Sequence, residues 1–346
     1  GSSKEKERKI MLSQLKKGEI DILIGTHALI EKRVEFRRLG LVIIDEQHKF
    51  GVAQRAKLWS KKREFYPHVL VMTATPIPRT LALTLYGDLD VSVIDELPSG
   101  RKEIITSHRF DNSRLKVFNF IKKTVDLGGQ VYVVYPLIEE SAKKDHKDLM
   151  DGYKGLTRYF PETQIGVLHG RMKSENKEYE MKRFADGKSK ILVSTTVIEV
   201  GVDVANASVI IIESAERFGL SQLHQLRGRV GRGSEQSYCI LMTKYDLSND
   251  SKERIKAMVG SSDGFKIANV DLKMRGPGNM MGTKQSGLLE LRFVNPAEDY
   301  NVIKQTRVVA SEVIEEDPNL NDQKNKGTKE YLKKSIKSNI NWSRVS

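Results

Sequence analysis

The chain has 346 residues, of which 39% are hydrophobic and 30% are charged. This length is too great for one small core, so we expect two globular domains and an appendage. No apolar run approaches the roughly 20 residues of a membrane-spanning helix. The single cysteine, Cys239, excludes a disulfide framework and a cysteine-based metal cluster. We therefore expect a reducing, cytoplasmic setting with no membrane partner.

The chain is strongly basic, with 58 Lys and Arg against 45 Asp and Glu and a net charge of +13. Such an excess is typical of proteins that bind nucleic acid. A lysine-biased composition explains it equally well, because the lysines are spread along the whole chain. The motifs have to decide between these two explanations.

Short apolar runs that end in polar residues alternate with longer amphipathic stretches, which is typical of parallel strands joined by crossover helices. Ligands of such α/β folds bind at the carboxyl ends of the strands. The Pro- and Gly-containing segment 95–101 indicates a linker, and helical, charged sequence follows residue 246. We therefore expect domains at 1–97 and 98–245, then a helical region and tail at 246–346. The apolar runs span 20–25, 41–45, 69–73, 131–135, 191–194 and 209–213.

The segment Leu41-Val-Ile-Ile-Asp-Glu-Gln-His48 places two carboxylates and a histidine at the end of a buried strand. A nucleotide hydrolase needs one carboxylate to hold Mg²⁺ and another to orient or deprotonate the attacking water. Asp45 and Glu46 fit these roles. A strand capped by solvated acids is the ordinary alternative, but the four apolar residues before the pair and Gln47-His48 after it make that reading weaker.

Two further segments carry candidate residues. The next expected strand ends in Thr73-Ala-Thr75, whose hydroxyls could bond the side chains at the previous strand end. In Gln225-Leu-Arg-Gly-Arg-Val-Gly-Arg232, Arg229 and Arg232 are three residues apart, which predicts neighbouring positions on one helical face. Guanidinium groups can stabilise the transition state of phosphoryl transfer. A basic solvated helix is the alternative, and the two glycines argue against it.

Together these segments resemble motifs II, III and VI of the second helicase superfamily. The resemblance implies that Asp45 (the Mg²⁺ ligand), Glu46, Gln225, Arg229 and Arg232 are catalytic, and that His48 senses the nucleotide. It implies that Thr73 and Thr75 couple the domains. The segment Thr195–Asp203 resembles motif V, so Thr195 and Thr196 would contact DNA while Gly201 and Asp203 sense nucleotide. Thr26, in a motif Ib-like segment, and His169, at a strand end, would also contact DNA.

Within that superfamily the chain resembles the RecG family. Asp45-Glu-Gln-His-Lys-Phe-Gly-Val52 and Thr73-Ala-Thr-Pro-Ile-Pro-Arg79 carry the likeness, as do the segments 218–225, 263–268, 271–278 and 282–287. The segments 263–268, 271–278 and 282–287 resemble a translocation hairpin, in which Arg275 would couple the domains and Gln285 would contact DNA. The transcription-repair coupling factor is the family closest in resemblance after RecG. Its motif II resembles Asp-Glu-Glu-Gln, whereas this chain has Asp45-Glu-Gln-His48, and this difference favours RecG.

The resemblance implies RecA-like α/β domains with parallel sheets, the first of them truncated, followed by a helical hairpin and tail. It also implies ATP and Mg²⁺ as cofactors and branched double-stranded DNA as partner. The phosphate-binding loop Gly-x-x-x-x-Gly-Lys-Ser/Thr does not occur in the sequence. We therefore expect a fragment that begins inside the first motor domain and hydrolyses ATP poorly by itself. A non-catalytic DNA-binding fragment remains the alternative from a different class.

Overall fold

The computed structural model describes residues 5–31, 33–46, 67–74, 90–94, 96, 98–136, 142–195, 204–275 and 299–338. The chain divides into two compact units. One unit comprises residues 1–75, 284–292 and 305–346, and the other comprises residues 76–283 and 293–304. The domain boundaries expected after residues 97 and 245 stay predictions.

The first unit begins with helix α1 (Glu5–Lys17) and continues through the 3-10 turn η1 (His27–Ile30). Two short strands, β1 (Leu41–Ile44) and β2 (His68–Val71), pair in parallel with each other. These strands confirm the apolar runs expected to be strands at 41–45 and 69–73.

The strand expected at 20–25 is not present. This segment has no regular structure, and Ile22 and Ile24 are 79% and 90% exposed. A strand is stabilised by the ladder it forms with a neighbour. Among the described residues β1 and β2 pair only with each other, so the apolar pattern of 20–25 is not enough to form a strand.

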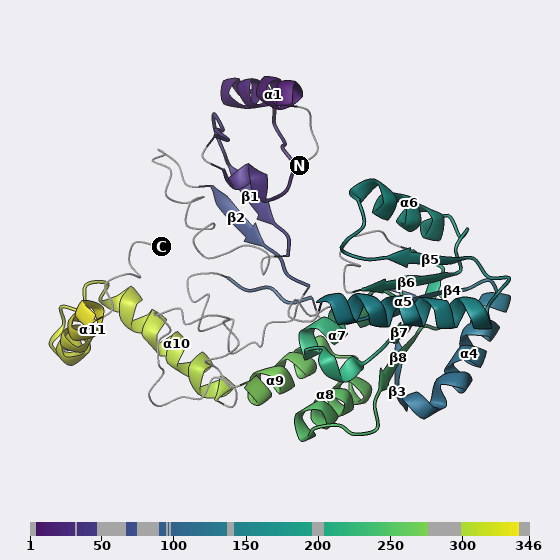
Figure 1. The fold of residues 1–346 in the computed structure, drawn as a ribbon. Coiled ribbons are helices and arrows are strands. Elements are labelled where there is room, and N and C mark those ends of the chain that lie inside the picture. Colours follow the sequence, from purple (N-terminus) through teal and green to yellow (C-terminus); the bar gives the residue numbers. More distant parts are fainter. Residues whose placement is uncertain are drawn as a thin grey trace. The chain divides into compact units, whose positions relative to one another are not determined.

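The second unit contains a sheet of six parallel strands in the order β3-β8-β7-β4-β6-β5 (Figure 1). The runs expected at 131–135, 191–194 and 209–213 are confirmed as β4, β6 and β7. The sequence pattern did not single out β3, β5 or β8; β3 and β5 are edge strands and include polar or small residues. The strands are β3 (Ile105–Phe110), β4 (Gln130–Tyr135), β5 (Ile165–Leu168), β6 (Ile191–Thr195), β7 (Ala207–Ile212) and β8 (Tyr238–Thr243).

Helices cover both faces of this sheet, which confirms the α/β fold class. All six residues of β4 are buried, as expected for a central parallel strand. Alternate residues enter two cores: Tyr132 and Val134 face one, Val131 and Val133 the other. The first core is covered by α6 (Ser174–Ala185), α7 (Leu220–Arg227), α8 (Asn249–Gly260) and α9 (Gly264–Arg275), the second by α4 (Arg114–Asp126) and α5 (Ala142–Tyr159).

Each covering helix presents an apolar stripe to the sheet. On α4 the buried residues Val117 and Ile121 are four positions apart, the spacing that places side chains on one helical face. On α6 the fully buried Phe184 packs against Tyr132, with ring centroids 4.8 Å apart. Burying one such side chain stabilises the fold by about 1.5–3 kcal/mol. These contacts fix the helices, and with them the loops at the carboxyl edge of the sheet.

After residue 246 the described residues form helices and no strand, as the sequence predicts. Helix α10 (Tyr300–Glu316) is followed by α11 (Lys326–Ser338), and both lie within the segment 246–346 that was expected to be a helical region and tail. Asp317 organises the turn between them, because its carboxylate accepts the backbone N–H groups of Asn321 and Asp322, both at 2.8 Å.

Candidate functional site

Asp45 and Glu46 stand directly after strand β1. Ile44, the last residue of the strand, is buried, whereas Asp45 is exposed. The backbone N–H of Glu46 donates to Asp45 Oδ1 at 2.8 Å, and the φ angle of Glu46 is 54°. Residues other than glycine rarely adopt this left-handed conformation, and such strain concentrates at functional sites. The two carboxylates therefore leave the strand through a strained turn.

Thr73 lies at the same edge of the first unit. The N–H of Met72 donates to the carbonyl of Ile44 at 2.7 Å, so pairing continues up to the residues just before Asp45 and Thr73. Thr73 is exposed, as is Thr26, which precedes η1 and makes no side-chain capping bond. The structure thus brings Asp45, Glu46 and Thr73 to one edge of a parallel strand pair, and places Thr26 in a separate turn.

In the second unit, Thr195 and His169 occupy the carboxyl ends of neighbouring strands. Thr195 is the last residue of β6 and is 1% exposed, and its buried Oγ1 has no hydrogen-bond partner among the residues that the structure describes. His169 follows β5 and is half-buried, and its backbone N–H donates to Met172 Sδ at 3.4 Å. Both residues lie at the edge where α/β folds bind ligands, and their contacts with DNA stay predictions.

Arg229 and Arg232 do not lie on a helical face, and this part of the prediction is wrong. Helix α7 ends at Arg227, and the φ angle of Gly231 is 77°. Glycine adopts this conformation without steric cost, so it turns the chain away from the helical path. The two arginines project from a turn, in which Arg229 is half-buried and Arg232 is exposed. Gln225 lies on α7 itself.

The segment before β3 holds this turn. Arg101 Nε donates to the carbonyl oxygen of Gly231 at 2.6 Å. A Cβ atom on Gly231 would lie 2.8 Å from Ile104 Cγ1, closer than side chains normally approach. Residue 231 therefore has to be glycine for two reasons, its backbone conformation and the close approach of Ile104.

Arg227 anchors the end of α7, a role that its place in the sequence does not reveal. Its side chain is 3% exposed. Burial lowers the pKa of its guanidinium. Carbonyl groups at the end of α8 and directly after it replace the lost hydration, since the carboxyl end of a helix carries partial negative charge. Its five acceptors are Thr106 Oγ1, Met258 O, Ser261 O, Ser262 O and His224 Nδ1, at 2.7–3.4 Å.

His224 is neutral because of the same arrangement. Burial, followed by the positive charge of Arg227, lowers the pKa of His224 to about 4. Arginine can only donate, so Nδ1 of His224 accepts from Arg227 Nη2 at 3.1 Å and the ring proton lies on Nε2. Arg227 and His224 therefore fix the helix that carries Gln225 and precedes Arg229.

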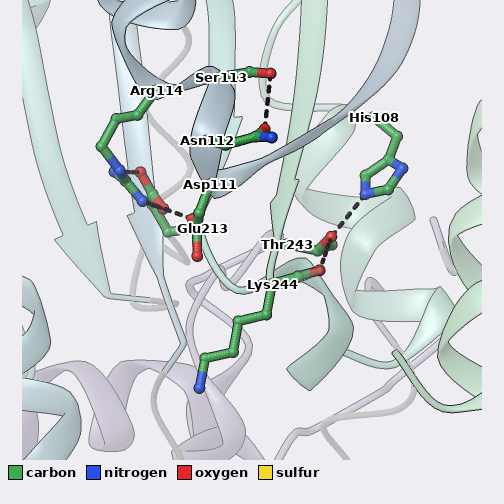
Figure 2. A network of polar contacts seen from close by, with 8 residues as sticks. All are labelled: His108, Asp111, Asn112, Ser113, Arg114, Glu213, Thr243 and Lys244. Atoms are coloured by element: carbon green, nitrogen blue, oxygen red, sulfur yellow. Dashed lines mark hydrogen bonds and ion pairs between the residues drawn. The ribbon is translucent and has the colours of Figure 1, made fainter. Parts of the chain in front are cut away.

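A second group of charged residues lies at the carboxyl edge of the sheet (Figure 2). Arg114 forms two hydrogen bonds with Glu213, at 2.6 and 2.9 Å, and one with Asp111 at 3.0 Å. None of these residues belongs to a motif that the sequence reveals. One signal was available, because Glu213 closes the apolar run at 209–213.

Several predicted residues lie outside the described part of the chain, and the roles assigned to them stay predictions. Arg275 ends helix α9, but its side chain is also outside the described set. The residues outside are His48, Thr75, Thr196, Gly201, Asp203 and Gln285.

Two general features of the described residues bear on binding chemistry. No helix among them is both long and apolar enough to cross a membrane. Over the same ranges, no three His, Cys, Asp or Glu side chains gather in a way that could hold a metal ion.

The parallel α/β sheet covered by helices on both faces is the fold of RecA-like helicase domains. Residues 1–84 match the DEAD/DEAH box helicase family, and residues 115–234 match the helicase conserved C-terminal domain. A Mycobacterium smegmatis helicase, Lhr, has a similar fold, with a TM-score of 0.50 at 19% identity over 70% of this chain and 34% of that chain.

The chain belongs to the RecG family. Residues 261–346 match the family described as ATP-dependent DNA helicase RecG, domain 3, C-terminal. The RecG helicase of Synechocystis is 55% identical over 92% of this chain and 38% of its own, and that of Bacillus subtilis is 49% identical over 91% and 46%. A RecG structure bound to a three-way DNA junction has a TM-score of 0.64 at 47% identity, over 81% of this chain and 36% of that chain. The preference for RecG over the coupling factor is confirmed, and the chain spans less than half the length of these relatives.

Proposed function

We propose that this chain is part of an ATP-dependent DNA helicase that remodels branched DNA, such as stalled forks and Holliday junctions, in a cytoplasmic setting. The observation that carries the proposal is the presence of two sets of motor residues in one RecG-family chain. The carboxylate pair of residues 45 and 46 follows β1, and Arg229 and Arg232 follow α7. A DNA partner is supported by the related RecG structure, which was determined with a three-way DNA junction.

The chemistry assigned to the first unit rests on two neighbouring carboxylates. Asp45, exposed after β1, suits a Mg²⁺ ligand because hard cations prefer carboxylate oxygens. Glu46 would orient the attacking water and accept its proton. Mg²⁺, when bound with ATP, supplies positive charge to the phosphate oxygens. Thr73, at the same edge, and Thr75 would couple the nucleotide state to the movement of the domains.

The second unit supplies positive charge and contacts with DNA. Arg229 and Arg232 would stabilise the charge that develops on the phosphates, and Gln225 would assist them from α7. His169, Thr195 and Thr196 would contact the DNA backbone. The remaining assigned roles are nucleotide sensing by His48, Gly201 and Asp203, DNA contact by Thr26 and Gln285, and coupling by Arg275.

The chain by itself should bind ATP weakly and hydrolyse it slowly. Phosphate affinity in such motors comes mainly from a glycine-rich loop whose N–H groups and lysine surround the phosphates. The sequence contains no such loop. Asp45 and the two arginines cannot replace this positioning, on which most of the catalysis of phosphoryl transfer depends.

The test uses a full-length RecG-family protein that contains this chain, called here the intact helicase. Glu46→Gln should abolish DNA-stimulated ATP hydrolysis and leave ATP binding intact, because an amide cannot accept a proton from water. Arg229→Ala should lower turnover by roughly 10³-fold or more. Near-normal turnover in either variant would refute the assigned role. Comparable turnover by the isolated chain and the intact helicase would refute the expected need for the loop.

A further inference from the structure

Charged and polar residues from several elements of the second unit meet at the carboxyl edge of its sheet. They come from the turn directly after β3, the start of α4, the end of β4, the middle of α5, and the segment from β7 to η5 (Ala215–Arg217). We call this group the edge cluster. Its members are Asp111, Arg114, Tyr135, Asp148, Glu213 and Arg217.

The centre of the edge cluster is a two-pronged ion pair. Arg114 Nη1 and Nη2 donate to the two carboxylate oxygens of Glu213 at 2.6 and 2.9 Å (Figure 2). Arg114 Nη2 also donates to Asp111 at 3.0 Å. The Glu213 side chain is 7% exposed. A planar guanidinium that binds both oxygens fixes the distance and also the orientation between α4 and the end of β7.

The electrostatics keep the Arg114 guanidinium charged. Burial alone would lower the pKa of Arg114, but its hydrogen bonds with Glu213 and the attraction of that carboxylate outweigh burial, so the pKa is raised. Burial, and then the charge of Glu213, raises the pKa of Tyr135, so the phenol stays protonated. A Cβ atom on Gly152 of α5 would lie 1.9 Å from the Tyr135 hydroxyl. The phenol therefore also packs directly against the backbone of α5.

The cluster holds both ends of the short segment that leads into α7. At its start, the N–H of Glu213 donates to Val134 O of β4 at 2.8 Å, in addition to the ion pair with Arg114. At its end, Arg217 Nη1 lies 3.9 Å from Asp148 Oδ2 of α5. Ser214, between these two anchors, has φ 49° and ψ 48°. A left-handed non-glycine residue persists only where its surroundings impose it.

The segment from Ser214 leads to Leu220, where α7 begins, and α7 ends immediately before the turn that carries Arg229. We propose that Arg114 and Glu213 are positioning residues that fix the entry of α7 and, through this helix, place Arg229 for ATP hydrolysis. The inference rests on the proposed function, since it needs Arg229 to act on ATP. Along the chain, Glu213 precedes α7 and Arg227 ends it, so one anchor stands before the helix and the other at its end.

The experiment measures steady-state ATP hydrolysis by the intact helicase with saturating branched DNA. In Glu213→Gln, the amide NH₂ group faces an arginine donor, so the two-pronged pair is lost. We expect kcat to fall by about tenfold or more while the KM for ATP changes by less than about twofold, because a displaced Arg229 weakens the transition state and not the bound substrate. Glu213→Asp keeps the negative charge on a shorter side chain and should give an intermediate kcat. If Glu213→Gln does not fold, the kcat of Glu213→Asp tests the proposal in its place.

A double variant separates positioning from stability. In Arg114→Met/Glu213→Leu, apolar contacts replace the pair, which often restores stability. We expect its melting temperature to approach that of the unmodified protein while kcat stays low. Recovery of kcat together with stability would mean that the pair is only structural, and would overturn the proposal. As a matched control, Lys154→Met removes an exposed ion pair on α5, 4.0 Å from Asp151, and should leave kcat unchanged.

Arg229→Ala, measured in parallel, separates this inference from the proposed function. Normal turnover in Arg229→Ala would show that the assigned chemistry is wrong. An inactive Arg229→Ala beside a folded Glu213→Gln with normal kcat would instead leave the proposed function standing and reject the positioning role of the edge cluster.

Discussion

Replacing His224 by asparagine should remove a pH dependence from the stability of the second unit. The pKa of His224 is lowered from 6.5 to about 4 in the folded protein. The unfolded state therefore binds a proton more readily between these two values, and the free energy of unfolding rises with pH across this window. Folded stability is lost as the pH falls from about 6.5 towards 4, and the asparagine variant lacks this contribution.

The magnitude follows from proton linkage. Between about pH 7.5 and pH 5 the histidine should cost the folded state about 2 kcal/mol, at 1.36 kcal/mol for each pKa unit. Asparagine Oδ1 can still accept from Arg227, so at neutral pH the variant should lie within about 1 kcal/mol of the unmodified protein.

Hydrogen exchange of the peptides that cover β7 and α7 measures the opening free energy of this unit at each pH. The unmodified protein should lose about 2 kcal/mol more than the asparagine variant on acidification, since the other histidines contribute equally to both proteins. Parallel curves for the two proteins would refute the neutral, buried state of His224.

Three further predictions concern packing, backbone and coupling. Phe184→Ala should destabilise the second unit by about 3–5 kcal/mol, because it leaves a cavity beside Tyr132, and urea unfolding followed by circular dichroism measures this change; a loss below about 1 kcal/mol would contradict the packing. Gly231→Ala should lower the melting temperature, because alanine is strained at the left-handed φ angle of this position and its Cβ would clash with Ile104. An unchanged melting temperature would contradict the described geometry of this turn. In the intact helicase, Arg275→Ala or Gln285→Ala should preserve ATP hydrolysis but reduce fork unwinding, and an equal loss of both activities would reject the coupling role.

The sequence determined the features that depend on neighbouring residues. The central strands could be predicted because β4, β6 and β7 are continuous apolar runs, as burial on both faces of a parallel sheet requires. The strand-end position of Asp45 and Glu46 follows from the same local pattern, with polar residues directly after the run. The resemblance carried by the motifs supplied the family, which the comparisons confirmed.

The local sequence pattern predicted the wrong secondary structure where that structure depends on contacts with residues distant in the sequence. The run at 20–25 has the composition of a strand, but a strand also needs a neighbour to pair with. The sequence places two glycines near Arg229, yet only the contacts of Gly231 with Arg101 and Ile104 show that the chain turns there instead of continuing the helix.

Only the tertiary structure revealed the anchors of α7. Arg227 reaches carbonyl groups 31–35 residues further along the chain, and Glu213 meets a guanidinium 99 residues before it. No local pattern distinguishes these side chains from the many exposed charges of a basic protein. What sets them apart is burial, because a buried charge has to find its partners within the fold, and which partners it finds depends on how the strands and helices pack.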